Sequence, residues 1–330
     1  MKRIISLSQE RRQLLFETTA REMKISSVVV EKDFWVCVVL NYLLNESQYK
    51  DYFIFKGGTS LSKCYDVIKR FSEDVDLILK WDKIGFKDEE VFLNRSKNQD
   101  YKFETLMNER GLSFIQNELN EDLTKYLASS IKGMRIESNP NDPMVLFVYY
   151  PNSYKNDYIE QAVKLEIGPV AAKTPTEVSH IEPYCYRFFN VEVKEPIIVN
   201  IVTIARTFWE KLLILFAECN RPMDKKTPDR YSRHYYDIYM IYKSKFFADI
   251  ASQKNLFEEV KLFKSKFYRT SWSNIENASL NSIKLIPSKE RLTIIESDYK
   301  KMSDMFFETS PSFEELLNGL SQLEEELKTR

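Results

Sequence analysis

Two glycines stand side by side in a chain that contains very few of them. Only 7 of the 330 residues are glycine, about 2%, whereas an average protein has ~7%. Gly57 and Gly58 follow the apolar run at residues 52–55, and Thr59 and Ser60 come next. A residue without a Cβ lets the backbone turn sharply and lets a ligand approach the main chain. A helix that begins here would point unpaired N–H groups, with two hydroxyls beside them, at an anion such as a triphosphate.

Two aspartates lie at the start of the next apolar run. Asp74 and Asp76 alternate with Val75, Leu77 and Leu79. In a strand the two carboxylates would share one face, and the apolar side chains would enter a core from the other. A hard divalent cation, Mg²⁺ above all, relieves the repulsion between such carboxylates. A phosphate cradle beside a carboxylate pair is what phosphoryl and nucleotidyl transfer require, because the protein's main tasks there are to position reactants and neutralise charge.

Both features fall within residues 55–79, FKGGTSLSKCYDVIKRFSEDVDLIL. This stretch resembles the signature of the AbiEii/AbiGii-type nucleotidyltransferases, the toxins of type IV toxin–antitoxin and abortive-infection systems. The family belongs to the DNA polymerase β-like nucleotidyltransferase superfamily. The matching residues are Gly57, Gly58, Thr59, Ser60, Leu61, Lys63, Arg70, Phe71, Ser72, Asp74, Asp76 and Leu77.

The resemblance implies an α+β fold, in which a mixed β-sheet flanked by helices is followed by a C-terminal helical domain. It also implies an enzyme that uses one or two Mg²⁺ ions to transfer a nucleoside monophosphate from an NTP to an RNA acceptor, such as the 3′ end of tRNA. A cognate antitoxin from a neighbouring gene would neutralise it. In such an enzyme the residues expected to bind the nucleotide are Gly57, Gly58, Thr59, Ser60 and Lys63.

A third carboxylate is expected on a strand at residues 162–168, AVKLEIG, where Lys164 and Glu166 share the polar face. Enzymes of the superfamily carry such a group on a neighbouring strand, and Glu166 resembles it. It would complete the metal site of Asp74 and Asp76 or act as a general base towards the attacking hydroxyl. The alternative is an exposed glutamate paired with Lys164 or with a lysine on a neighbouring strand.

Residues 201–220, IVTIARTFWEKLLILFAECN, have the apolar spacing of a helix with one buried stripe. Lys211 lies off this stripe, and a lysine in such a place is ordinarily solvated. The motif TFWEKLLIL, however, resembles the lysine motif of the family. The resemblance implies that Lys211 contacts nucleotide phosphates, for which its compact ammonium is suited.

The next expected helix carries Arg233 and Asp237 four residues apart. A surface ion pair is one interpretation. In the family an Arg-x-x-x-Asp pattern on this helix borders the active site. The resemblance therefore implies that Arg233 binds the nucleotide and that Asp237 anchors Lys211 or a substrate group. His234 stands where many relatives carry an aspartate.

The loop before this helix holds a local cluster of basic residues, which could receive an RNA backbone or remain hydrated. They are Arg221, Lys225, Lys226 and Arg230. Over the whole chain, 48 Lys and Arg residues nearly balance 49 Asp and Glu residues. No global field therefore attracts nucleic acid, so any RNA binding must use such a local patch.

Two domains are expected from the element pattern. Residues 1–200 would form the nucleotidyltransferase domain with its N-terminal helices, and residues 201–330 a helical domain that completes the active-site cleft. Helices are predicted at residues 8–46 (two, the first capped by Ser8 and the second by Ser26 or Ser27), 59–70, 100–128 and from 201 to the end. Strands are predicted at 52–55, 75–79, 144–150 and 162–168, with a polar hairpin between the last two and one or two more strands within 184–199. EKDFW, residues 31–35, also occurs in relatives before the signature, but an amphipathic packing helix is the favoured interpretation.

Composition excludes several other classes. The four cysteines are widely spaced without a C-x-x-C motif, and only two histidines occur. Zinc sites, disulfide scaffolds and Ser-His-Asp constellations are therefore poorly supported. The chain has no run of ~18 apolar residues, and its start becomes charged too early for a secretory signal. We expect a soluble, cytoplasmic protein with no membrane partner.

Two other functions stay open at this level. One is nucleotidyl transfer to a protein side chain, and the other is a nucleotide-binding or partner-binding module of the same fold without catalysis. The set of Asp74, Asp76 and Glu166 argues against the second, because a domain without chemistry has little reason to cluster carboxylates. Ser72, two residues before Asp74, is either a turn-forming serine or a regulatory phosphoacceptor.

Overall fold

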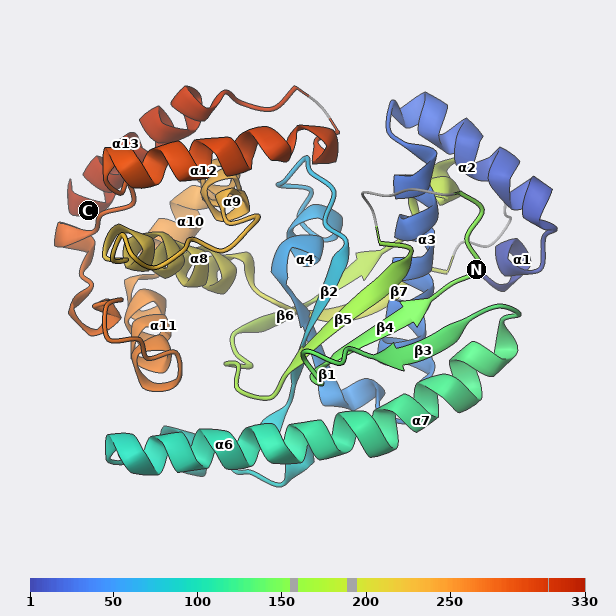
Figure 1. Cartoon of the computed structure of the whole chain (residues 1–330), viewed down its shortest axis with the longest axis horizontal. Coiled ribbons are helices and arrows are strands. Elements are labelled where there is room, and N and C mark those ends of the chain that lie inside the picture. Colours follow the sequence, from blue (N-terminus) through green and yellow to red (C-terminus); the bar gives the residue numbers. More distant parts are fainter. Residues whose placement is uncertain (155–159, 189–194, 308, 330) are drawn as a thin grey trace. The chain divides into compact units, whose positions relative to one another are not determined.

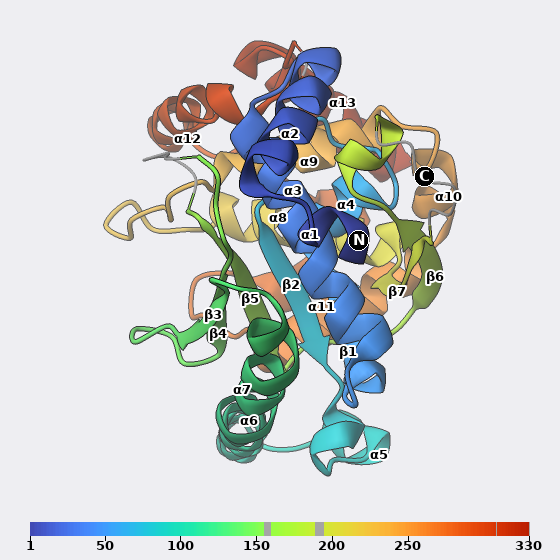
Figure 2. The same cartoon turned by 90° about the vertical axis from the view of Figure 1, so that its right-hand side faces the viewer.

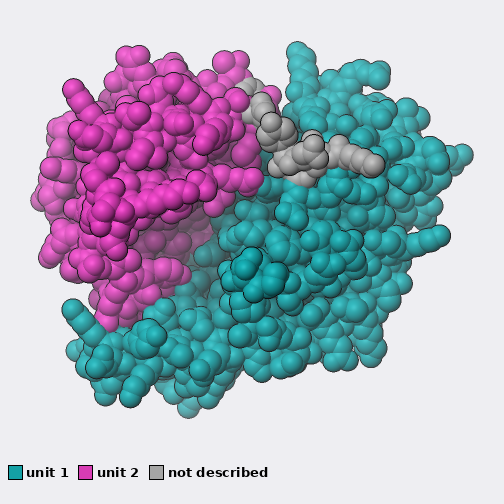
Figure 3. Space-filling view, in the orientation of Figure 1, with its two compact units in different colours: residues 1–64, 71–201 teal, residues 65–70, 202–330 magenta. Residues whose placement is uncertain are grey.

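The computed structural model describes residues 1–154, 160–188, 195–307 and 309–329. The chain forms two compact units (Figures 1 and 3). Unit 1 consists of residues 1–64 and 71–201, and unit 2 of residues 65–70 and 202–330. The short segment 65–70 therefore belongs to the C-terminal unit, although the residues on both sides of it belong to the first.

Unit 1 begins with the helices α1 (Lys2–Ile5), α2 (Gln9–Met23) and α3 (Ser27–Asn41). The predicted caps are confirmed, since Ser8 accepts a hydrogen bond from the N–H of Arg11 and Ser26 from that of Val28. Helix α3 is buried along almost its whole length and packs against β5 (Ala162–Gly168), where Figure 2 shows it in the foreground. A π-helical turn (Tyr42–Glu46) and a 3₁₀ turn (Lys50–Tyr52) lead on to the sheet.

The sheet of the described chain has seven strands in the order β3-β4-β5-β2-β1-β7-β6. Besides β5, these are β1 (Phe53–Lys56), β2 (Asp74–Leu79), β3 (Arg135–Ser138), β4 (Val145–Tyr149), β6 (Thr176–Ile181) and β7 (Ile197–Val202). Strand β2 runs parallel to β5 and antiparallel to β1, and β1 runs parallel to β7. The prediction of an α+β fold with a mixed sheet is confirmed.

The four strands predicted with definite bounds are present within one or two residues. Strands β3 and β6 were not predicted, because each lies at an edge of the sheet and is largely exposed, so apolar alternation is weak. Most of the predicted hairpin between β4 and β5 lies outside the described residues, since 155–159 are not among them. The region 184–199 yields the start of β7, and residues 189–194 lie outside the described part.

The helix predicted at residues 59–70 begins within two residues of the observed start, but its predicted end is wrong, because α4 spans Gly57–Lys63. Asp66 has a positive φ of 51°, which no helix accommodates. The backbone of Lys69 makes its hydrogen bonds within unit 2: its N–H donates to the Tyr236 hydroxyl (3.0 Å), and its C=O accepts from Phe307 N–H (2.9 Å). The backbone of this segment is thus hydrogen-bonded to distant residues instead of within a helix, and the local sequence does not show which residues those are.

The remaining helices of unit 1 follow β2. They are a 3₁₀ turn (Trp81–Ile84), α5 (Asp88–Phe92), α6 (Lys97–Ser113) and α7 (Asn120–Asp122), with π-helical turns at Phe114–Leu119 and Leu123–Leu127. Residues 97–127 are helical throughout, so the long helix predicted at 100–128 is confirmed. Further 3₁₀ turns lie at Ala128–Ser130 and Tyr184–Arg187.

Unit 2 is helical, as predicted. Its helices are α8 (Ile204–Cys219), α9 (Ser232–Tyr242), α10 (Phe247–Ser252), α11 (Lys254–Phe267), α12 (Lys289–Lys301) and α13 (Phe313–Thr329). Short 3₁₀ turns lie at Ile275–Asn277, Leu280–Ser282 and Ser303–Met305. Helix α8 packs against α9 and α11, and α13 packs against α9. Within the described ranges, every helix is too short or too polar to cross a lipid bilayer.

Candidate active site

The two aspartates of β2 lie on one face of the sheet in unit 1. Along this strand half-buried and buried side chains alternate, so that Asp74 and Asp76 face one way and Val75 and Leu77 the other. In the parallel register with β5, Asp74 is opposite Lys164 and Asp76 is opposite Glu166. Paired residues of neighbouring strands point to the same side. The three acidic residues therefore share the face that the sequence predicted for them.

The glycine turn lies directly against one of these carboxylates. Gly57 has a φ of +83°, and a Cβ built on it would lie 1.9 Å from Oδ2 of Asp76. Such a contact is impossible, so only glycine fits both the conformation and the space. Lys56 is paired with Asp76 across β1 and β2. The turn and the aspartates, which the sequence placed 15 residues apart or more, are thus brought together.

Glu166 forms an ion pair with Lys164, and the two side chains are 38% and 32% exposed. This is the pairing that the sequence allowed as the alternative to a catalytic role. In the part of the chain that the structure describes, no three His, Cys, Asp or Glu side chains converge as a ready metal centre. The role of Glu166 as a third metal ligand or general base therefore stays a prediction.

The polar side chains of the glycine-turn helix α4 are engaged within unit 1. The Thr59 hydroxyl donates to the main-chain oxygens of Ser72 (3.2 Å) and Asp74, and the buried Ser60 hydroxyl donates to that of Gly57 (2.9 Å). The two hydroxyls therefore fix the turn and tie it to the start of β2. Gly58 is buried beside them.

Lys63, also predicted to contact the nucleotide, points into the interior of unit 1. Its ammonium pairs with the Asp33 carboxylate and lies 4.2 Å from the centre of the Tyr184 ring. Burial acts to lower the pKa of Lys63, but the Asp33 carboxylate outweighs it and raises that pKa. The lysine is therefore charged and held in place by a buried partner.

A second group of charged residues lies inside unit 2. The fully buried Asp237 on α9 accepts two hydrogen bonds from the Arg70 guanidinium, Nε to Oδ1 and Nη2 to Oδ2, each of 2.9 Å. Its Oδ2 also lies 3.0 Å from Nζ of Lys211 on α8. The structure thus contains the contact between Asp237 and Lys211 that the resemblance implied.

Burial acts to raise the pKa of Asp237, but the charges of Arg70 and Lys211 outweigh it and hold that pKa well below its usual value. Burial lowers the pKa of Lys211, against the effect of Asp237. Burial, followed by the charges of Lys211 and Arg233, also holds the pKa of His234 well below its usual value. Nδ1 of the neutral His234 lies 3.3 Å from Nζ of Lys211. With Lys211 charged, its ammonium donates to Nδ1, which assigns the imidazole proton to Nε2.

Arg70 is the member of this group to which the sequence assigned no role. It lies within the signature, but its partner Asp237 is 167 residues away. A basic residue flanked by the apolar Val67, Ile68 and Phe71 was the available signal, because a charge in such surroundings needs a buried counter-charge. The half-buried Arg233 acts on Lys211 and His234 through its charge.

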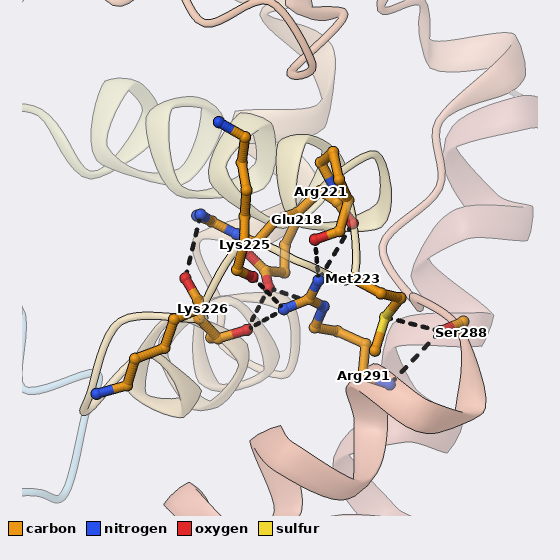
Figure 4. Close-up of polar contacts among 9 residues, drawn as sticks. Glu218, Arg221, Met223, Lys225, Lys226, Ser288 and Arg291 are labelled. Atoms are coloured by element: carbon orange, nitrogen blue, oxygen red, sulfur yellow. Dashed lines mark hydrogen bonds and ion pairs between the residues drawn. The ribbon is translucent and has the colours of Figure 1, made fainter.

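The loop between α8 and α9 is held from the inside by one arginine. Figure 4 shows Arg291 of α12 pointing into this loop. Its guanidinium donates to the main-chain oxygens of Arg221 (3.2 Å), Pro222 (2.6 Å) and Lys225 (3.0 Å). It also donates to the Thr227 hydroxyl (2.8 Å). These carbonyl groups therefore turn inward.

The predicted basic cluster divides into an inner and an outer part. Arg221 lies inside, where it pairs with the buried Glu218 (2.6 Å) and stacks 4.3 Å from the Trp272 ring. Lys225, Lys226 and Arg230 are exposed, which leaves three cations of the loop at the surface.

Residues 38–319 match the model of the family described as nucleotidyl transferase AbiEii toxin, type IV toxin–antitoxin system. The chain belongs to this family. The match includes the glycine turn, both aspartates of β2 and the helices α8 and α9, and it confirms the resemblance found in residues 55–79. The protein is therefore a nucleotidyltransferase of the toxin class, and membership implies a nucleotide substrate and an antitoxin partner.

Two solved structures are similar to the chain at low sequence identity. JHP933 from Helicobacter pylori is 18% identical with a TM-score of 0.45, and the alignment covers 92% of this chain and 94% of that one. MenT4, a nucleotidyltransferase toxin from Mycobacterium tuberculosis H37Rv, is 16% identical with a TM-score of 0.46, with 93% and 98% covered. No curated protein matches the chain significantly.

Proposed function

We propose that this toxin is a Mg²⁺-dependent enzyme that transfers a nucleoside monophosphate from an NTP to an RNA acceptor, with the 3′ end of tRNA as the type of end it uses. One observation carries the proposal: the carboxylate of Asp76 lies against Gly57, so that a group able to bind a cation and the glycine turn share one place. Nucleotidyl transfer needs both, because its substrate is a metal-bound triphosphate.

The residues of this face fit a divalent cation. Asp74 and Asp76 offer the carboxylate oxygens that Mg²⁺ prefers, and the missing Cβ at Gly57 leaves room for Oδ2 of Asp76 beside the turn. When bound there, Mg²⁺ would neutralise charge on the phosphates. Glu166 would join the two aspartates as a ligand or take the proton of the attacking hydroxyl, after release from Lys164.

The chain's other residues would hold the triphosphate. The main chain at Gly57 and Gly58 would approach it closely, while Thr59 and Ser60 keep the turn in shape. Lys211 would contact a phosphoryl oxygen, since its contacts with Asp237 and His234 use two of its three N–H groups. Arg233 would add a second positive charge. Compensation of the charge on the departing pyrophosphate is the catalytic benefit.

The loop of unit 2 favours an RNA acceptor. Its three exposed cations stand on a backbone that Arg291 holds from within. Side chains on a fixed backbone lose less freedom when they contact phosphates, and each such contact releases a counterion. We also propose that the antitoxin is encoded by a neighbouring gene and neutralises the transfer activity.

The test is incubation of the purified protein with Mg²⁺, each α-labelled triphosphate in turn, and either total RNA or bacterial protein. The proposal predicts that label enters RNA, that EDTA prevents it, and that the Asp74→Asn variant does not catalyse it. If label enters only protein, the acceptor is a protein side chain and not RNA. Label in neither acceptor from any of the four triphosphates would overturn the proposal.

A further inference from the structure

Three consecutive charged residues are buried in the first turns of α3. Glu31, Lys32 and Asp33 are 2%, 1% and 3% exposed. They belong to the motif EKDFW, for which packing of a helix was a sufficient explanation at the sequence level. Packing alone does not account for buried charges, because each one loses its hydration and must find a partner. Successive helix residues point about 100° apart, so the three partners lie in different segments.

Lys32 is joined to the start of the aspartate strand. Its ammonium donates to Oε2 of Glu73 (2.9 Å) and to the main-chain oxygen of Glu160 (2.8 Å). The Glu73 side chain is 9% exposed. Because Glu73 directly precedes Asp74, Lys32 holds the residue next to the start of β2.

Asp33 is joined to the end of the glycine-turn helix. One of its oxygens pairs with the ammonium of Lys63, the last residue of α4, and the other accepts the N–H of Tyr184 (2.7 Å). Both side chains of the Asp33–Lys63 pair are 4% exposed. Neighbouring residues of one helical turn therefore hold the end of α4 and the start of β2.

The end of α4 and the start of β2 lie close to the two positions in the sequence where the chain leaves unit 1 and returns to it. The first segment of unit 1 ends at Cys64, and the second begins at Phe71. Lys63 and Glu73 therefore lie on either side of the segment 65–70, which belongs to unit 2. The pairing of β1 with β2 and the Thr59 hydroxyl already join the turn to β2, and the two buried ion pairs add one contact at each end of the segment that belongs to unit 2.

We propose that Lys32 and Asp33 are positioning residues of the nucleotidyltransferase site, which fix the spacing between the glycine turn and the aspartates of β2. The inference rests on the proposed function, since it assumes that these two elements act together. Neither residue touches substrate in this account. Both act through the partners that they hold.

The test compares Lys32→Met, Glu73→Gln and the double variant of the full chain. Lys32→Met leaves the Glu73 carboxylate buried without its cation, so this variant should melt at a lower temperature. In the double variant no unpaired charge remains, and the melting temperature should recover. Asp33→Asn keeps the shape of its side chain and tests the other contact. Lys300→Met, in the exposed pair with Glu296 (2.8 Å), is the matched control.

Three quantities are measured besides the melting temperature. They are the affinity for Mn²⁺, from the signal of free Mn²⁺ in electron paramagnetic resonance, and kcat and KM for the nucleotide. If the two residues position the site, the double variant regains its melting temperature but binds Mn²⁺ about 10-fold more weakly. Its kcat falls by about 10- to 100-fold, the range for residues that orient metal ligands. Asp33→Asn shows the same loss, and Lys300→Met resembles wild type.

A double variant and an Asp33→Asn variant that both retain Mn²⁺ affinity and kcat within about threefold would overturn the inference, because positioning losses are larger. Asp76→Asn separates this failure from failure of the proposed function. If wild type and Asp76→Asn bind Mn²⁺ equally, the metal site itself is misplaced. If wild type binds Mn²⁺ and Asp76→Asn does not, the proposed metal site is supported. If the double variant then binds Mn²⁺ as tightly as wild type, Lys32 has no positioning role.

Discussion

At Gly57 a single added carbon atom would collide with the carboxylate of Asp76. A Cβ at this position would lie 2.6 Å from Cγ and 1.9 Å from Oδ2, and the positive φ adds backbone strain of about 1–2 kcal/mol for any other residue. Gly57→Ala should therefore lower nucleotide incorporation by about 100-fold, because it displaces the Asp76 carboxylate on which the proposed metal site depends.

The matched control for this variant is Gly168→Ala in the same sheet. A Cβ on Gly168 meets nothing within 4 Å. Its activity should stay near that of wild type. An active Gly57→Ala variant would show that the contact between the turn and Asp76 does not matter for the chemistry.

Glu31 gives stability a defined dependence on pH. Burial raises the pKa of Glu31 to about 7, against hydrogen bonds from the Ser153 N–H and the charge of Arg12. The folded protein therefore binds this proton more tightly than the unfolded chain does. The resulting stabilisation, up to about 3 kcal/mol, is complete below the unfolded pKa of about 4.5 and is lost as pH rises through about 7.

Glu31→Gln should remove this dependence. Relative to wild type, the variant should gain stability between pH 5 and pH 8, because the wild type alone loses a favourable proton over that interval. Urea unfolding at both pH values measures the difference, with Glu296→Gln on the exposed face of α12 as the control. A constant difference between variant and wild type would contradict the account.

At this scale, sequence reasoning succeeded where chemistry follows from strand alternation. It placed Asp74 and Asp76 on one face of the strand. For Glu166 it allowed either a catalytic role or an ion pair with Lys164, and the structure contains this ion pair. It had no access to the Arg70–Asp237 pair, because a local pattern shows that a charge is buried without showing which distant residue pairs with it.

At the scale of single elements, the strands beside the site were predictable and helix α4 was not. Apolar and polar residues alternate in β2 and β5, and burial follows that alternation. Residues 64–70 also have a helix-like composition, yet Lys69 makes its backbone hydrogen bonds to Tyr236 and Phe307. Propensity is a weak prior where tertiary partners are available.

Helix α12 stabilises the loop before α9 through a second contact besides Arg291. The carboxylate of Asp298 accepts hydrogen bonds from the N–H groups of Arg230 and Ser232, each of 2.8 Å. Asp298→Ala should raise the hydrogen-exchange rates of these two amides by about 10-fold, which corresponds to the loss of one charged hydrogen bond.

Mass spectrometry of hydrogen exchange over residues 228–234 provides the measurement. Glu296→Ala lies on the same helix in an exposed pair with Lys300 and should leave the exchange unchanged. Equal exchange in Asp298→Ala and Glu296→Ala would show that α12 does not hold this loop.

For the whole molecule, the division into units makes a prediction about truncation. Residues 65–70 belong with residues 202–330, and the 2% exposed Arg70 has its partner Asp237 there. A chain that ends at residue 203 should therefore expose this segment, because its hydrogen-bonding partners are missing. Trypsin should cleave it after Lys69 or Arg70 faster than the full chain. Equal resistance of the two chains at these bonds would show that the segment is stable without unit 2.

The central claim is that the carboxylates of β2 beside the glycine turn carry out nucleotidyl transfer. It is tested most directly by the rate of label transfer from an α-labelled NTP to RNA, with Mg²⁺, in wild type and Asp76→Asn at matched melting temperature. The account predicts a loss on the order of 10³-fold in kcat for Asp76→Asn, because the carboxylate proposed to bind Mg²⁺ loses its charge. Transfer by Asp76→Asn at close to the wild-type rate would contradict it.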